Sequence, residues 1–78
     1  MQAKVYVTLK HGVLDPQGKA VAHALDTLGF KEVQDVRIGK YIELTLPDLP
    51  KEKAQARLKE MCEGLLANTV IESYKIEV

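Results

Sequence analysis

The residues of this chain that could do chemistry are few: two histidines, one cysteine and scattered charged side chains. His11 and His23 have no cysteine or histidine partner at the spacing of a zinc site. Cys62 lies in the apolar stripe of a predicted helix, where nothing nearby in sequence would lower the pKa of its thiol. We therefore expect a packed thiol, no metal site and no catalytic centre.

Residues 12–19, GVLDPQGK, place a glycine-bearing turn before a helix start, an arrangement that can bind phosphate. The segment lacks the spacing of the P-loop and of the dinucleotide fingerprint. Asp15, at the expected start of the helix, would also repel an anion. A capped helix start, with Asp15 as N-cap and Pro16 in the first turn, is the better interpretation.

Arg37, Gly39 and Lys40 form a second candidate group. Lys40 shares strand parity with apolar residues, and a charge is unfavourable on a packed face. Its position is reasonable if this part of the strand lies at a subunit boundary. A solvated face is the alternative that stays open.

These charges sit in a segment, Val36 to Leu46, whose apolar residues alternate with only Lys40 interrupting. As one strand it would span roughly 36 Å, whereas a compact chain of this length should be about 30 Å across. A strand that overhangs its own domain has an unpaired edge, which a second copy of the chain can cover. The pattern predicts an assembly module.

Four further elements flank this segment. Strands are expected at residues 3–10 and 70–78, a helix at 16–28 ended by Gly29, and a second helix after the sequence PDLP at 47–50, ended by Asn68 in the left-handed conformation. The apolar stripes that should be buried are Val21, Ala24, Leu25 and Leu28 in the first helix, Ala54, Leu58, Met61, Cys62, Leu65 and Leu66 in the second, and Val70, Tyr74, Ile76 and Val78 in the last strand.

The expected fold is therefore an α+β two-layer sandwich of order β-α-β-α-β. An antiparallel sheet would carry both helices on one face and contain a long central strand. A turn at residues 38–40 would give the related ferredoxin-like pattern instead. A two-residue turn at Gly39 and Lys40 would mix the two faces, so one long strand, with a kink allowed at Gly39, is favoured.

The composition limits the classes of protein to which this chain can belong. The 78 residues are expected to form one domain, 1–78, whose small core would gain from dimerisation. Eleven basic residues balance eleven acidic ones, which argues against nucleic acid. No apolar stretch reaches the length of a membrane span, no signal peptide is recognisable, and a single cysteine fits a reducing compartment. We expect a cytoplasmic protein.

Three segments together, GVLDPQGKA at 12–20, VRIGKYIEL at 36–44 and LLANTVIE at 65–72, closely resemble the PurS family. These are small subunits of phosphoribosylformylglycinamidine synthase, an enzyme of de novo purine synthesis. The resemblance covers essentially the whole chain. One departure is Thr69, where the family commonly has proline, and it touches no chemistry.

The resemblance implies a non-catalytic subunit that binds no cofactor. A glutaminase subunit would release ammonia, and a synthetase subunit would use it with ATP and Mg²⁺ to convert formylglycinamide ribonucleotide to the formylglycinamidine ribonucleotide. A strand-sharing homodimer, or a tetramer, would bridge these two subunits. By motif match, the partner contacts are expected at Lys10, Gly12, Asp15, Gln17, Arg37, Gly39, Lys40 and Asn68. Caps at Gly12, Asp15 and Asn68, and a kink at Gly39, are the alternatives.

Two rival functions are weighed beside this one. A ferredoxin-like regulatory domain would bind a small ligand, such as an amino acid, at a dimer interface. An acylphosphatase-like hydrolase would use Arg37 and Asn68 but needs an anion-cradling loop that the sequence lacks. RNA binding is weaker still, because Phe30 is the only phenylalanine and tryptophan is absent.

Overall fold

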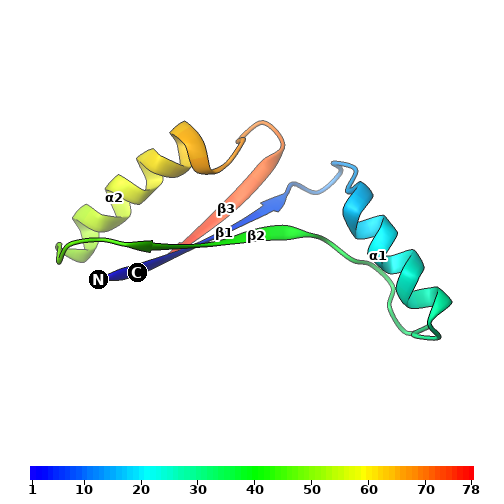
Figure 1. Ribbon diagram of the computed structural model, residues 1–78. Helices are drawn as coiled ribbons and strands as arrows, with labels where there is room; N and C mark the ends of the chain where they lie inside the picture. The colour runs from blue at the N-terminus through cyan, green and yellow to red at the C-terminus, as the bar shows by residue number, and fades with distance from the viewer.

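The computed structural model describes all 78 residues. Its elements are β1 (Gln2–Leu9), α1 (Pro16–Thr27), β2 (Gly39–Thr45), α2 (Lys51–Met61), a π-helical turn η1 (Cys62–Leu66) and β3 (Glu72–Glu77). The strands form one antiparallel sheet in the order β2-β1-β3 (Figure 1). The expected α+β class and the order β-α-β-α-β are confirmed.

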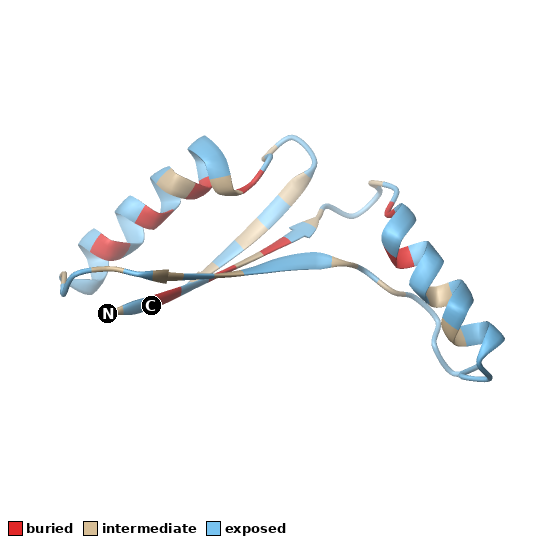
Figure 2. Ribbon diagram, in the orientation of Figure 1, coloured by how far each residue is buried: buried red, intermediate tan, exposed pale blue.

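Alternation along β1 decides which side of the sheet is covered. Ala3, Val5 and Val7 are buried beneath α2, while the residues between them lie on the opposite face. The strand register places Ile42 of β2 and Ile76 of β3 on either side of Val5. Because side chains alternate between faces, these residues form one apolar layer. Figure 2 shows the buried positions of α2 turned toward this layer, so α2 and the sheet form two layers.

The position of α1 differs from the expectation that both helices cover one face of the sheet. Only α2 does so, and α1 lies beyond the opposite end of the sheet (Figure 1). The molecule is consequently 48 Å long, with a radius of gyration of 15.9 Å, whereas a compact chain of this length should give about 11–12 Å. The stripe on α1 indicated correctly that this helix has an apolar side. The prediction failed because a stripe does not specify which surface covers that side, and here Val21 and Leu28 stay exposed.

The long alternating segment passes through Gly39 without turning back, so the ferredoxin-like hairpin is not formed. The assigned strand starts at Gly39, which pairs with Thr8, rather than at Val36. Residues 36–38 lead from β2 toward α1 (Figure 1). The register would bring Ile38 opposite Leu9, but no pair forms there: the Ile38 amide donates to the Asp15 carboxylate, and the Leu9 carbonyl accepts from Arg37.

The ends of the two helices agree only in part with those predicted from the sequence. Asp15 caps α1, Pro16 is its first residue, and Gly29 follows the C-cap with a φ of 100°, as predicted. Asn68 is not left-handed, since glycines alone have positive φ in this chain. Its side-chain oxygen instead accepts a hydrogen bond from the amide of Val70 at 3.2 Å, and its carbonyl accepts one from Glu72 at 2.7 Å. Asn68 therefore shapes the turn into β3 through hydrogen bonds.

Two of the predicted core positions near this turn are also wrong. Leu65 is 85% exposed and Val70 is 81% exposed. Leu65 lies in the π-helical turn, in which the amide of Ala67 donates to the carbonyl of Cys62 at 3.0 Å. A π-helix has more residues per turn than an α-helix, so the stripe drawn at α-helical spacing misses the inward side at this point.

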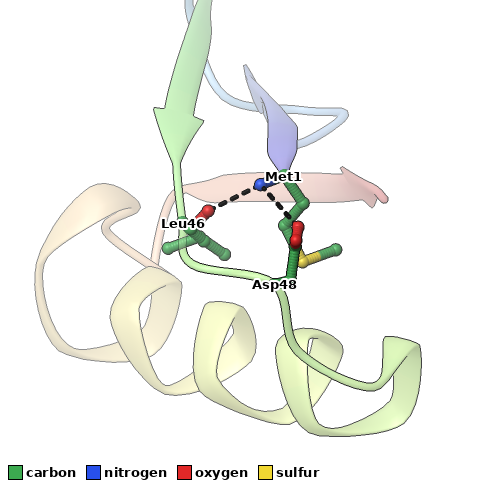
Figure 3. Close-up of polar contacts among 3 residues, drawn as sticks. All are labelled: Met1, Leu46 and Asp48. Carbon is green, nitrogen blue, oxygen red and sulfur yellow. Dashed lines mark hydrogen bonds and ion pairs between the residues drawn. The ribbon is translucent and has the colours of Figure 1, made fainter.

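The opposite end of the sheet is closed by the first residue. The Met1 ammonium donates hydrogen bonds to the carbonyl of Leu46 at 2.6 Å and to the Asp48 carboxylate at 3.4 Å (Figure 3). The amide of Leu46 donates back to the carbonyl of Met1 at 2.8 Å. These bonds hold the segment between β2 and α2 against the start of β1. The candidate site lies at the other end of the sheet.

Candidate functional site

All eight residues that the sequence analysis predicted as partner contacts lie at one end of the sheet. They lie on four segments: the end of β1 and the loop after it, the start of α1, the start of β2 with the residues before it, and the loop before β3. Hydrogen bonds join these segments, since the amide of Lys10 donates to the carbonyl of Ile71 and the Arg37 guanidinium donates to the carbonyls of Leu9 and Lys10. The nominated residues are, in that order, Lys10, Gly12, Asp15, Gln17, Arg37, Gly39, Lys40 and Asn68.

Asp15 is the most enclosed of them, with 6% of its surface exposed. One carboxylate oxygen accepts from the amide of Gly18 and the other from the amide of Ile38, both at 2.8 Å. These bonds, that from Ile38 most of all, hold the pKa of the carboxyl below its ordinary value, and the nearby Arg37 charge acts in the same direction. Each Asp15 carboxylate oxygen is therefore bound to an amide of its own chain.

Arg37 joins the residues before β2 to the end of β1. Its Nη2 atom donates to the carbonyl of Leu9 at 3.2 Å and to that of Lys10 at 2.9 Å. The side chain is otherwise exposed, as is that of Lys40. Two cationic side chains are thus exposed at this end of the sheet, where an acidic surface of another protein could meet them.

Two glycines permit close backbone approaches in the site. A Cβ atom at Gly39 would overlap the carbonyl oxygen of Val7, and one at Gly18 would overlap that of Val36. Gly39 was nominated from sequence, whereas Gly18 was missed. Gly18 could have been noticed because glycine is unfavourable inside a helix, and a glycine in the first turn of a predicted helix therefore suggests close contact with another part of the backbone.

A cleft of about 190 Å³ opens among these segments. Its lining offers one ammonium group, two carboxylates, an amide and a hydroxyl, so it can bind through hydrogen bonds and charge. It holds no cysteine or histidine to serve as nucleophile or base. Glu72 is the charged lining residue that the sequence did not predict, because only the pairing of β3 with β1 brings it there. The lining residues are Val7, Thr8, Leu9, Asp15, Gln17, Ile38, Gly39, Lys40 and Glu72.

The remaining reactive side chains lie outside this cleft. His11 and His23 are exposed. Cys62 is fully buried, and burial raises the pKa of its thiol, which keeps it protonated and unreactive. No group of three or more His, Cys, Asp or Glu residues is placed to hold a metal ion, and none of the helices is long and apolar enough to span a bilayer.

Exposed apolar side chains characterise the α1 end of the molecule. Leu28 is 72% exposed, and Leu14 and Phe30 are about half exposed or more. Apolar groups gathered on one elongated projection are typical of a surface that another chain covers. The fold and the site thus define an assembly module, built to be completed by other chains.

Comparison with known proteins identifies which assembly module this is. The family model described as "PurS: Phosphoribosylformylglycinamidine (FGAM) synthase" matches residues 2–78. The PurS subunit of Bacillus subtilis is 60% identical over 77 residues, covering 99% of this chain and 90% of the relative. That of Synechocystis is 53% identical over 75 residues, covering 96% and 75% respectively.

Solved structures agree. Bacillus subtilis PurS in its C2 crystal form superposes with a TM-score of 0.86 at 59% identity, over 97% of this chain and 94% of that one. A chain of PurLQS from Thermotoga maritima gives 0.85 at 33% identity, over 99% and 96%. The chain belongs to the PurS family, the PurS subunits of phosphoribosylformylglycinamidine (FGAM) synthase of purine biosynthesis. The resemblance seen in the sequence is confirmed.

Proposed function

We propose that this chain is a non-catalytic bridging subunit of FGAM synthase, acting in the cytoplasm, that docks the glutaminase subunit to the synthetase subunit and supports ammonia transfer between them. ATP and Mg²⁺ are used by the synthetase subunit, and this chain binds no cofactor. The observation that carries the proposal is the 48 Å length of a chain whose α1 leaves its apolar residues uncovered. Similarity to a chain of PurLQS from Thermotoga maritima supports it.

The chemistry explains why a bridge is needed. Ammonia released into water at neutral pH becomes ammonium, which is not a nucleophile. The route between the glutaminase and the synthetase must therefore exclude bulk water. A subunit that holds two larger proteins in a fixed relation meets that requirement without any reactive group of its own.

We further propose that the chain forms a strand-sharing homodimer. Residues 36–38 are not paired with any strand, and Val21 and Leu28 on the apolar side of α1 stay exposed beyond the end of the sheet. A second copy can cover both. Sedimentation equilibrium over a micromolar concentration series is expected to show a dimer, or a tetramer if dimers pair. A monomer throughout the series would contradict the proposal.

Charge reversal at the candidate site tests the docking role. R37E together with K40E is expected to abolish glutamine-dependent activity of the reconstituted synthase, because two cations that face a partner become anions. Ammonia-dependent activity of the synthetase subunit should survive at least in part, since it needs no glutaminase. Both activities staying normal would show that Arg37 and Lys40 are simply solvated.

Two controls separate docking from misfolding. Arg37 also holds Leu9 and Lys10, so K40E alone, at a side chain with no recorded hydrogen bond, should reproduce part of the loss. K53E reverses an exposed lysine on α2, remote from the site, and should leave both activities unchanged. Circular dichroism would confirm that all variants are folded.

A second candidate function, a small-ligand regulatory domain, is favoured by the cleft at the end of the sheet. It predicts that a metabolite panel, including amino acids and nucleotides, contains a compound that raises the unfolding temperature of the isolated chain. K40E should then remove that response. No stabilisation across the panel would count against this function.

A further inference from the structure

A hydrogen bond at its first turn attaches α1 to the residues before β2. The helix stands beyond the end of the sheet (Figure 1). Val21 and Leu28 on its apolar side are exposed. At its first turn, however, the buried Asp15 carboxylate joins two segments that are distant in sequence. One oxygen accepts from Gly18 of α1 itself, and the other from Ile38 in the residues before β2.

Two neighbouring contacts continue this attachment toward the sheet. The carbonyl oxygen of Val36 lies so close to Gly18 that no Cβ atom would fit between them. The Arg37 guanidinium, whose charge acts on the Asp15 carboxylate, donates to the carbonyls of Leu9 and Lys10. The direction in which α1 leaves the sheet is therefore set at residues 36–38, and Asp15 is the side chain that binds α1 to them.

We propose that Asp15 is a positioning residue for assembly: by binding Ile38 it fixes the direction of α1, and thus orients the apolar side of this helix toward a second copy of the chain. The inference rests on the proposed homodimer, which supplies the surface that α1 meets. A helix held by few contacts would otherwise sample many directions, and the ordering cost would weaken association.

Asparagine at position 15 separates this role from ordinary helix capping. Asparagine and aspartate cap helices about equally well, through one oxygen that accepts from the first turn. A carboxylate has two acceptor oxygens, whereas an amide has one oxygen and one NH₂ donor. D15N can therefore keep the bond from Gly18 but would place a donor against the amide of Ile38.

Amide hydrogen exchange on the intact chain measures the first consequence. In D15N the Ile38 amide is expected to exchange about tenfold faster, as follows from loss of a hydrogen bond to a charged acceptor, while the Gly18 amide stays protected. D35N is the matched control. Its carboxylate accepts only from the adjacent Val36 amide, at 3.0 Å and exposed to solvent, so the Ile38 amide should exchange as in the parent.

Sedimentation equilibrium of the same variants measures the second consequence. The dissociation constant of the D15N dimer is expected to rise about tenfold, with the D35N dimer unchanged. A simple capping residue would give neither effect in D15N. A dimeric parent whose D15N variant exchanges and associates like it would overturn the inference, as would faster exchange at Ile38 without weaker association. A monomeric parent would refute the proposed homodimer first, and this inference with it.

Discussion

Replacing Gly18 with alanine should destabilise this protein, although helix propensity alone predicts the opposite. Gly18 lies in the first turn of α1 and is buried. An alanine there would place its Cβ against the carbonyl oxygen of Val36, and at 2.9 Å from a carboxylate oxygen of Asp15. Backbone cannot move aside as a flexible side chain can, so either α1 or residues 36–38 must shift.

The expected size of the effect follows from two opposing contributions. Exchanging glycine for alanine inside a helix stabilises by about 1 kcal/mol. Forcing extra atoms into a filled space typically costs about 1–3 kcal/mol. Gly64, in the π-helical turn, has nothing within 4 Å of an added Cβ, so G64A supplies the first contribution without the second. The difference between the two variants, about 1–3 kcal/mol, isolates the overlap.

Urea unfolding of G18A, G64A and the parent at one chain concentration measures this difference, because self-association would otherwise shift the apparent stability. With a slope near 1 kcal/mol per molar, the midpoints of G18A and G64A should differ by about 1–3 M. If G18A proves as stable as G64A, then α1 does not lie against residues 36–38. Asp15 would then not bind Ile38 in the way described above.

Two further predictions concern the core and acid stability. Leu58 of α2 is fully buried, so L58A should lower the free energy of unfolding by about 2–5 kcal/mol. Leu65 is 85% exposed, so L65A should lower it by less than about 0.5 kcal/mol. Equal losses would show that Leu65 points inward and that the π-helical turn is described wrongly. Because the pKa of Asp15 is lowered in the folded protein, its carboxylate stabilises the fold fully above the ordinary carboxyl pKa of about 3.9. This stabilisation is lost as the pH falls through the lower pKa of the folded state. The difference in unfolding midpoint between the parent and D15N should therefore narrow as the pH is lowered from 6 toward about 2. A gap that stays constant over this range would show that the charge of Asp15 is not what stabilises the site.

Local patterns in the sequence were sufficient for the elements and for most of their orientation. The alternation around Val5 and Ile42 predicted which side of the sheet is buried, and the structure confirms it. Asp15 and Gly29 were correctly placed at the ends of α1. Such signals are readable because they depend on contacts between residues close in the chain, whose geometry the backbone period sets.

The sequence predicted individual residues of the site but not how they lie relative to one another. Sequence reasoning nominated Asp15 and Lys40 on separate grounds, and the antiparallel register is what brings them to one cleft. It missed Glu72, which reaches the cleft by pairing of β3 with β1, and Gly18, whose purpose is visible only when Val36 lies against it. Strand pairing joins residues far apart in sequence, and no local pattern encodes the partner.

What the sequence alone determined is that both helices carry an apolar stripe and that one alternating segment is too long for a compact domain of this size. What the tertiary structure decided is where that surface lies, with α2 on the sheet and α1 beyond its end (Figure 1). The physical reason is that periodicity marks a side chain for burial without naming the surface that buries it. For α2 that surface is its own sheet, and for α1 it is not.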